Sequence, residues 1–315
     1  MKLVMIDGGL GNQVFQYIFY RYLQEAGESD VYIDDRFFSV HTSEYYTNEY
    51  KGYELKRVFG LTPSLLSEHF DKDVWQEILE TTKSNNKLHF IDLMRANGIQ
   101  LRVVSEANFI ATYKELIAKA FPETPIQSYE GPFKSVVANA YHPDIVKLEG
   151  NVYYHGYWIN GNYFKKIRDI IIEELAFPDF DDDKNKEMAE KLQREKSVVM
   201  HVRRGDFVKF GWAMDSTFYD YATIAIRLRM PKPNIYVFSD DLEWCRENRN
   251  LLGLTENVNA EFVEGNTGDN AFRDMQLMSL CKIMIISNSS FSYLAALLNK
   301  NPDKIVLNPT PRLIV

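Results

Sequence analysis

The chain has 315 residues, of which 45% are hydrophobic, enough to build the cores of two domains of ordinary size. Its formal net charge is −8, so the field of the whole protein repels polyanions and argues against nucleic acid as a partner. The apolar run at residues 1–6 is too short for a signal peptide, and no run approaches the ~18 residues of a membrane span. We therefore expect a protein without a membrane span that is not exported.

The N-terminal region opens with the pattern of a β-α-β unit. A buried strand is predicted over residues 2–6, a helix carries Val14, Phe15 and Ile18 on its apolar face, and a strand follows at residues 31–34. The first loop, residues 7–13, resembles a dinucleotide-binding fingerprint, but Val14 stands where the third glycine belongs. This departure argues against NAD.

Residues 39–150 are predicted to be partly irregular. An amphipathic stretch covers residues 63–79, a strand is predicted at 101–104, and prolines and glycine mark loops between 122 and 132. After an acidic turn at 179–183, strands and helices alternate again. Strands are predicted at 197–202, 234–238, 261–263, 283–286 and 304–307, and helices at 184–195, 216–230, 242–250, 270–281 and 290–298.

Strands that alternate with helices indicate parallel, doubly wound sheets. We therefore predict an α/β protein with two Rossmann-like domains, at residues 1–180 and 181–315. The two cysteines, Cys245 and Cys281, lie in segments predicted as helical without metal-ligand spacing, so we expect free buried thiols and a reducing compartment.

Arg203 and Arg204 follow the predicted strand at 197–202 directly. Guanidinium groups pair bidentately with phosphate, and ligands of open α/β sheets bind beyond the carboxyl ends of the strands. The pair therefore indicates a site for a diphosphate-containing ligand. The alternative is a solvated turn in which the arginines pair with Asp206.

Polar residues also follow the neighbouring strands. Ser239, Asp240 and Asp241 end one strand, and residues 287–290 end another, with Ser290 opening a helix whose N–H groups suit a phosphate. Plain N-capping by serine explains the second group equally well. Asp274 is placed either to accept two N–H bonds from guanine or to carry a surface charge near a helix start.

A metal site finds little support in the sequence. The six histidines are scattered without paired spacing, and the Asp-x-Asp pattern of many metal-dependent sugar transferases occurs only as Asp181-x-Asp183, within the acidic turn. We expect no metal and no other cofactor.

Five segments together, in order and spacing, resemble the α1,2-fucosyltransferases of glycosyltransferase family 11, bacterial type, which also includes the blood-group H enzymes. The segments are residues 8–17, residues 156–158 with Tyr163 and Phe164, residues 201–207, residues 238–244, and residues 274–281 continuing to 286–292.

The resemblance implies a GT-B fold, in which the two Rossmann-like domains face each other across a cleft. It implies GDP-fucose as donor, bound by domain 181–315, and an acceptor on the side of domain 1–180. Fucose would pass, with inversion and without a metal, to the 2-hydroxyl of a terminal β-galactoside, in the synthesis of a surface glycan or O-antigen. We expect the enzyme in the cytoplasm or, for a lipid-linked acceptor, at the inner face of the membrane.

The resemblance also assigns roles to residues. Arg203 and Arg204 would hold the diphosphate, His201 would line the nucleotide pocket, and Asp274 would bind guanine. The full donor set is Gly11, Asn12, His201, Arg203, Arg204, Ser239, Asp240, Asp274, Asn288, Ser289, Ser290 and Phe291. Tyr157 and Trp158 are the predicted acceptor-side residues.

Catalysis is expected to rest on Arg203, Arg204 and Asp206. The arginines would stabilise the charge on the departing GDP, and Asp206 would either remove the proton of the attacking hydroxyl or orient an arginine. Two alternatives remain: a GDP-sugar transferase of another linkage, such as α1,6, and a catalytically silent protein that binds a glycan or nucleotide.

Overall fold

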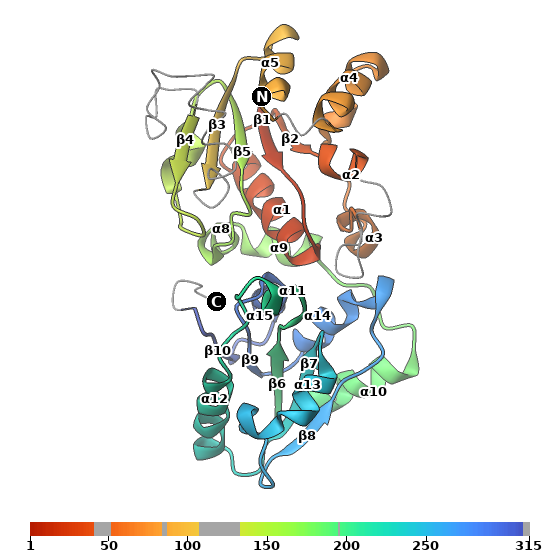
Figure 1. Ribbon diagram of the computed structural model, residues 1–315, viewed down its shortest axis with the longest axis vertical. Coiled ribbons are helices and arrows are strands. Elements are labelled where there is room, and N and C mark those ends of the chain that lie inside the picture. The colour runs from red at the N-terminus through yellow and green to blue at the C-terminus, as the bar shows by residue number, and fades with distance from the viewer. Residues whose placement is uncertain (41–51, 84–86, 107–132, 195, 311–315) are drawn as a thin grey trace. The chain divides into compact units, whose positions relative to one another are not determined.

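The computed structural model describes residues 1–40, 52–83, 87–106, 133–194 and 196–310. Its contacts divide the chain into two compact units, Met1–Glu174 and Leu175–Val315. Each unit contains a five-stranded parallel sheet with helices against it (Figure 1). These are the two Rossmann-like domains that the alternation of strands and helices predicts. The loops predicted between residues 122 and 132 lie outside the described residues.

Unit 1, residues 1–174, is built on a sheet with the strand order β2-β1-β5-β3-β4. Its strands are β1 Lys2–Met5, β2 Val31–Asp34, β3 Leu101–Glu106, β4 Phe133–Val136 and β5 Asn151–His155. Its helices are α1 Leu10–Glu25, α2 Arg36–Val40, α3 Leu55–Phe59, η1 Leu66–Glu68, α4 Lys72–Lys83, α5 Lys87–Ala96, η2 Pro143–Lys147, α8 Gly161–Lys166 and α9 Arg168–Glu174.

Two layers of side chains enclose the sheet of unit 1. On one face, Leu3, Val103 and Tyr153 pack with Ile78 of α4 and Met94 of α5. Because successive side chains of a strand point to opposite faces, Tyr154 lies on the other face, where its ring meets that of Phe19 of α1 at 5.2 Å. Helices therefore cover both faces, as a doubly wound sheet requires.

Strand β5 is, with the edge strand β4, one of the two strands of unit 1 that sequence patterns missed. It occupies the centre of the sheet, between β1 and β3, and its residues Val152 and Tyr154 are fully buried. Its sequence, Asn-Val-Tyr-Tyr-His, lacks a run of aliphatic residues and so does not indicate a buried strand. The amphipathic stretch predicted at 63–79 also proves to be η1 followed by α4, which begins only at Lys72.

Unit 2, residues 175–315, has the strand order β10-β9-β6-β7-β8. Its strands are β6 Ser197–Val202, β7 Asn234–Ser239, β8 Asn259–Phe262, β9 Ile283–Ile285 and β10 Ile305–Leu307. Its helices are α10 Asp183–Leu192, α11 Gly205–Lys209, α12 Ser216–Arg229, α13 Leu242–Glu247, η3 Arg249–Leu252, η4 Gly268–Asn270, α14 Phe272–Met278 and α15 Ser290–Leu298. All five predicted strands are present.

The core of unit 2 fixes the direction in which the functional side chains of β6 point. Val198, Met200 and Val202 pack on one face against Tyr219 and Ile226 of α12. His201 alternates with them and faces the opposite side, toward the start of α15. Both cysteines are free and buried, as predicted.

The acidic turn at residues 179–183 is bound to unit 2. Asp182 caps α10 by accepting a hydrogen bond from the Asn185 amide at 2.8 Å. Arg273 of α14 donates to the carbonyl of Pro178 at 2.8 Å and pairs with Asp181 at 2.9 Å. The turn that we predicted as a link therefore packs on α10 and α14.

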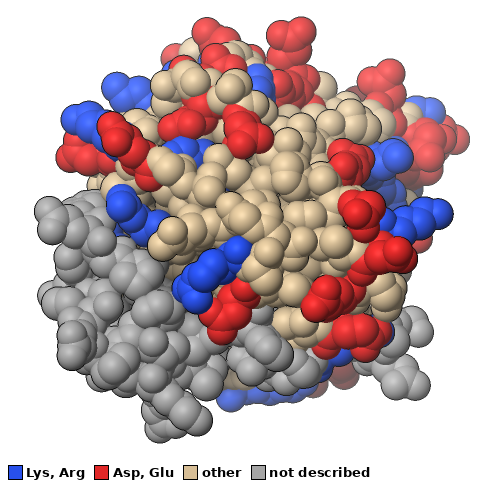
Figure 2. Space-filling view, turned by 90° about the horizontal axis from the view of Figure 1, so that it is seen from above, with Lys and Arg blue, Asp and Glu red and all other residues tan. Residues whose placement is uncertain are grey.

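Charged side chains of both signs are mixed on one face of the molecule. On the face in Figure 2, acidic and basic side chains lie interspersed around a central area of other residues, so the described residues there form no broad basic surface. No helix within the described part of the chain is both long and apolar enough to cross a bilayer.

Candidate functional site

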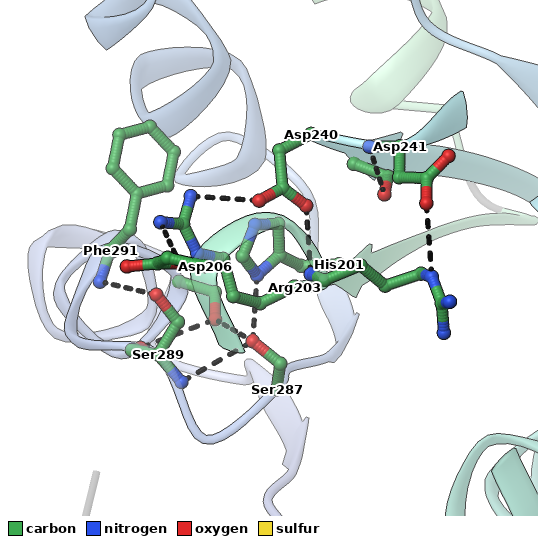
Figure 3. A network of polar contacts seen from close by, with 11 residues as sticks. His201, Arg203, Asp206, Asp240, Asp241, Ser287, Ser289 and Phe291 are labelled. Atoms are coloured by element: carbon green, nitrogen blue, oxygen red, sulfur yellow. Dashed lines mark hydrogen bonds and ion pairs between the residues drawn. The ribbon is translucent and has the colours of Figure 1, made fainter. Parts of the chain in front are cut away.

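Most of the predicted donor residues of unit 2 lie at one edge of its sheet. From β6 the chain continues to β7 and β8 on one side, and β9 and β10 lie on the other side. The strand order therefore reverses between β6 and β9, and such switch points are where open α/β sheets bind ligands. Figure 3 shows the side chains that gather at the carboxyl ends of β6, β7 and β9.

His201, near the end of β6, joins the two strands that flank the switch point. Its Nδ1 lies 2.9 Å from the hydroxyl of Ser287, which follows β9 (Figure 3). Burial, reinforced by the charge of Arg203, lowers the pKa of His201 to about 3. The ring is therefore neutral at physiological pH and can offer a ligand one donor or one acceptor, according to its tautomer.

Arg203 lies between two carboxylates. Its Nη2 donates to Asp206 at 2.6 Å, and its Nη1 pairs with Asp240 at 3.0 Å (Figure 3). Its Nε is buried and has no hydrogen-bond partner among the described residues. The guanidinium plane is thus held in place from two sides, while the buried Nε donor stays unused.

Arg204 is held by the residues that follow β7. Its backbone N–H donates to Asp240 at 2.8 Å, its Nε pairs with Asp241 at 3.1 Å, and its guanidinium carbon lies 3.6 Å from the ring centre of Trp244. The pairing with Asp206 that we gave as the alternative to a phosphate clamp is therefore present, but it involves Arg203 alone. Three carboxylates surround two guanidinium groups, so the cluster carries one excess negative charge.

The turn after β9 leads into the N-terminus of α15. The Ser289 hydroxyl accepts a hydrogen bond from the Phe291 amide at 3.3 Å and so caps the helix. The Asn288 side chain donates to the carbonyl of Trp212 at 2.9 Å and ties this turn to the segment after α11. The Phe291 ring lies 5.9 Å from that of His201. The same turn therefore caps α15 and packs against both His201 and the segment after α11.

Ser239, at the end of β7, has a local partner in this region. Its hydroxyl accepts a hydrogen bond from the Asp241 amide at 3.0 Å. Asp241 in turn caps α13 by accepting from the Trp244 amide at 3.1 Å. Both residues therefore shape the loop that presents Asp240 to Arg203.

Asp274 belongs to a different network of unit 2. Its carboxylate accepts a hydrogen bond from the Asn266 side chain at 2.8 Å, and Asn266 exchanges hydrogen bonds with Asn185. Burial raises the pKa of Asp274 to about 7, although the Asn266 contact and the charge of Lys184 oppose the rise. Among the described residues, Asp274 is hydrogen-bonded to Asn266 and to neither arginine, so its place in a donor site remains a prediction. A carboxyl group that titrates near neutrality is nevertheless typical of functional sites.

Unit 1 has its own switch point, between β1 and β5. Gly11 and Asn12 lie in the first turn of α1, just after the loop that follows β1. Tyr157, half-buried, follows β5. The Gln16 side chain of α1 donates to the carbonyl of Gly156 at 3.1 Å and so joins the two loops. Gly11, Asn12 and Tyr157 therefore border one edge of this sheet.

The structure does not support Trp158 as an exposed acceptor platform. Its side chain is 1% exposed and stacks on Phe19 of α1 at 4.4 Å, nearly parallel. An aromatic residue after a glycine turn suggests an exposed sugar platform, but here the ring fills the core between α1 and β5. Tyr157 is left as the predicted acceptor-side residue.

Three buried residues of unit 1 escaped prediction from sequence. The Gln13 side chain donates to the carbonyls of Gly8 and Gly52 and accepts from the Glu54 amide. Gln16 joins the two loops of the switch point, as described above. The Glu106 carboxylate, at the end of β3, accepts from the amides of Asn139, Tyr157 and Trp158.

These residues position loops. Burial raises the pKa of Glu106, while its three amide contacts act in the opposite direction. The signal for the two glutamines was their spacing: residues three apart in one helix share a face, and here that face is buried. Nothing in the local sequence indicates that Glu106 is buried.

A doubly wound domain with two arginines and a helix N-terminus at its switch point has features that are typical of nucleotide-binding α/β domains. Residues 142–312, just over half of the chain, match the family described as Glycosyl transferase family 11. The chain belongs to this family, as the resemblance predicts.

Several characterised proteins are similar to this chain. The alpha-1,2-colitosyltransferase of Escherichia coli is 32% identical over 170 residues, which are 52% of this chain and 57% of that protein. The O-antigen biosynthesis glycosyltransferase WbnK of Escherichia coli is 25% identical over 318 residues, 96% of this chain and 92% of that protein. Galactoside alpha-(1,2)-fucosyltransferase 2 of Gorilla gorilla gorilla is 26% identical over 170 residues, 50% of this chain and 48% of that protein. The matched region thus spans about half the length of the first and third relatives.

Among solved structures, the fucosyltransferase NodZ from Bradyrhizobium aligns with 94% of this chain and 92% of its own, at a TM-score of 0.46 and 14% identity.

Proposed function

We propose that the protein is a galactoside α1,2-fucosyltransferase, which moves L-fucose from GDP-fucose to the 2-hydroxyl of a terminal β-galactoside with inversion. The observation that carries the proposal is the pair Arg203 and Arg204, which lies at a switch point beside the start of α15 in a chain of family 11. The 2-linkage is supported by the names of the colitosyl- and fucosyltransferase relatives.

The donor would occupy unit 2. The guanidinium groups of Arg203 and Arg204 suit the diphosphate, and the amides at the start of α15, near Ser289 and Ser290, suit its remaining oxygens. His201 would face the nucleotide as a neutral ring, and the ionised carboxylate of Asp274 would accept the two N–H bonds of guanine.

The reaction breaks the bond between the anomeric carbon of fucose and a β-phosphate oxygen, and that oxygen keeps the electron pair. The acceptor hydroxyl forms the new bond on the opposite face and transfers its proton to a general base. Negative charge thus grows on GDP, and fixed cations aimed at that position stabilise the transition state more than the ground state. The 2.6 Å contact of Asp206 with Arg203 supports the orienting role for Asp206 over that of base.

We propose that this chemistry needs no metal. The carboxylates of Asp240 and Asp241, the best candidates for ligands at the site, each face an arginine. Within the described part of the chain, no group of three or more His, Cys, Asp or Glu side chains is arranged to hold a metal ion. The arginines would supply the positive charge that a divalent ion supplies elsewhere.

Unit 1 would contribute contacts to both the donor and the acceptor. Gly11 and Asn12 would approach the sugar phosphate, and Tyr157 would approach the acceptor, as the family resemblance implies. A surface glycan or O-antigen precursor fits this role, because one relative is named for O-antigen synthesis. We propose that the enzyme meets such an acceptor in the cytoplasm or at the inner face of the membrane.

A second donor is favoured by one comparison. The relative that is 32% identical is named for transfer of colitose in the same α-1,2 linkage. Colitose lacks one hydroxyl of fucose, so a fucose site that hydrogen-bonds the 3-hydroxyl would reject it, and a site built for colitose would lack that partner.

The test is release of GDP from GDP-fucose, and in parallel from GDP-colitose, with and without lactose. We expect release from GDP-fucose that depends on lactose and a product whose NMR spectrum shows an α1,2 bond. A product with an α1,6 bond would support the alternative linkage. Binding of GDP without any turnover would support the silent binding protein.

A further inference from the structure

The segment after the arginine pair exposes an apolar cluster. Phe210 and Trp212 are each 59% exposed, and Val208 is 47% exposed. The rings of Phe210 and Trp212 lie 4.9 Å apart and are inclined by 34°. Exposed large aromatic side chains that group together mark binding surfaces more often than single exposed residues do.

The backbone of this cluster is held in one conformation. The Trp212 and Ala213 amides both donate to the carbonyl of Phe207, at 2.7 and 3.1 Å. Gly211 has a φ of +69°, in the left-handed region that glycine adopts without cost, and so allows the turn between the two rings. Asn288 donates to the Trp212 carbonyl at 2.9 Å. The rings are therefore presented by a fixed turn.

The cluster is joined to the arginine site by direct contacts. The Trp212 ring meets the ring of Phe207 edge to face at 5.8 Å, and the Arg203 guanidinium lies 5.4 Å from the centre of the same ring. Asn288 adjoins Ser289, which caps α15. A surface that extends from the Arg203 site therefore continues through Phe207 to Trp212 and Phe210.

We propose that Phe210 and Trp212 form a stacking platform for the galactose ring of the acceptor. The inference rests on the proposed function, in which the diphosphate of the donor sits at Arg203 and the attacking hydroxyl must come close to it. In β-galactose the axial 4-hydroxyl leaves the opposite face with three neighbouring C–H groups, and such an apolar face packs on aromatic rings.

The exposure of the cluster favours the acceptor over the donor sugar as its occupant. A glycan acceptor has to extend from the reacting galactose into solvent, so its platform lies at an open surface. The fucose of the donor is tied to the diphosphate at the arginines. Val208 of α11 and Phe210, which caps this helix, are exposed, so a longer glycan could continue along them.

The test compares Trp212→Ala with Trp212→Phe, which keeps an aromatic ring, and with Tyr221→Ala, which removes an aromatic side chain that is 70% exposed on α12. We expect Trp212→Ala to raise the KM for lactose about tenfold, as loss of one well-packed ring contact would. The KM for GDP-fucose should stay within about twofold. Trp212→Phe should restore most of the acceptor affinity, and Tyr221→Ala should change neither constant.

Two outcomes would overturn the platform. An equal rise in the KM for GDP-fucose would assign the rings to the donor sugar, and unchanged constants would show that they touch neither substrate. Binding of methyl β-galactoside in the presence of GDP, measured by saturation-transfer NMR, makes this test independent of turnover. Transfer to no galactoside would contradict the proposed function, whereas equal galactoside binding by wild type and Trp212→Ala would contradict the platform alone.

Discussion

Arg203 shows how much of the site depends on the shape of one side chain. Its two terminal nitrogens reach Asp206 and Asp240, and its Nε is buried without a hydrogen-bond partner among the described residues. Lysine keeps the charge but offers a single nitrogen, so it cannot span both carboxylates and also grip a diphosphate. Orientation, more than charge, is what arginine supplies here.

We therefore expect Arg203→Lys to lower kcat/KM by about thirtyfold or more, which corresponds to about 2 kcal/mol of lost transition-state stabilisation. The melting temperature should change little, because the side chain is half-buried at a sheet edge. Arg246→Lys, which alters an exposed arginine of α13, is the matched control and should retain full turnover. Turnover of Arg203→Lys within a fewfold of wild type would contradict the clamp.

We expect the affinity for GDP to depend on pH, because the pKa of Asp274 is raised to about 7. Guanine N–H groups need an ionised acceptor, so the affinity for GDP should increase as pH rises through about 7 and level off above it. Asp274→Asn should weaken GDP binding by about tenfold at pH 8 and remove this part of the pH profile. Calorimetry of both proteins between pH 6 and 8 measures the effect, and the variant corrects for titration of the phosphate itself.

The carboxyl group of Asp274 also makes the stability of the folded protein depend on pH. The folded protein binds the proton more tightly than the unfolded chain, in which aspartate titrates near pH 4. The ionised carboxyl group therefore lowers the stability of the folded state progressively as pH rises from about 4 to about 7.

Parallel pH profiles of GDP affinity in wild type and Asp274→Asn would show that Asp274 does not face guanine.

At the scale of elements, the strands of unit 2 were predictable and the centre of unit 1 was not. β6 is an apolar run that ends at two arginines, so both the strand and the position of the site could be predicted from the local sequence. β5 is defined by aromatic packing against α1, which is a property of the assembled unit. Tertiary burial decides such strands, and short windows of sequence do not contain it.

The site divides in the same way. The arginines and serines follow strand ends, so the topology alone brings them together. The network of Asp274 depends on the loop that carries Asn266, and the burial of Trp158 depends on Phe19, far away in sequence. Those contacts could not be derived from spacing.

Trp158 leads to a prediction about stability. Truncation of a fully buried tryptophan leaves a cavity next to Phe19, so Trp158→Ala should destabilise unit 1 by about 3–5 kcal/mol. Tyr157→Ala removes a half-buried ring and should cost less. Urea unfolding followed by tryptophan fluorescence and circular dichroism measures both. A loss of acceptor affinity with unchanged stability in Trp158→Ala would return this residue to the acceptor site.

At the scale of the whole molecule, the protein is acidic, and even the two arginines of the site are surrounded by three carboxylates. The net charge of −8 attracts divalent cations to the surface without selectivity, while Arg203 and Arg204 sit at the switch point of unit 2. Effects of metal ions on the rate would therefore be general effects of screening.

Activity should accordingly survive exhaustive treatment with EDTA, and added Mn²⁺ should change the rate by no more than potassium chloride at equal ionic strength does. The measurement is GDP release before and after chelation. If chelation stops transfer and one divalent ion restores it, Asp240 and Asp241 become the first candidates for its ligands.

The pairing of Arg203 with Asp240 has a consequence for turnover. A diphosphate that arrives at Arg203 competes with a carboxylate already there, so binding exchanges one anion for another and gains less than it would at a bare cation. The same competition favours departure of GDP after transfer, a step that limits many enzymes. Asp240→Asn keeps the oxygen that accepts from the Arg204 amide but removes the charge. It should hold GDP several-fold more tightly and turn over more slowly under product inhibition, and weaker GDP binding in competition assays would show instead that Asp240 supports the nucleotide directly.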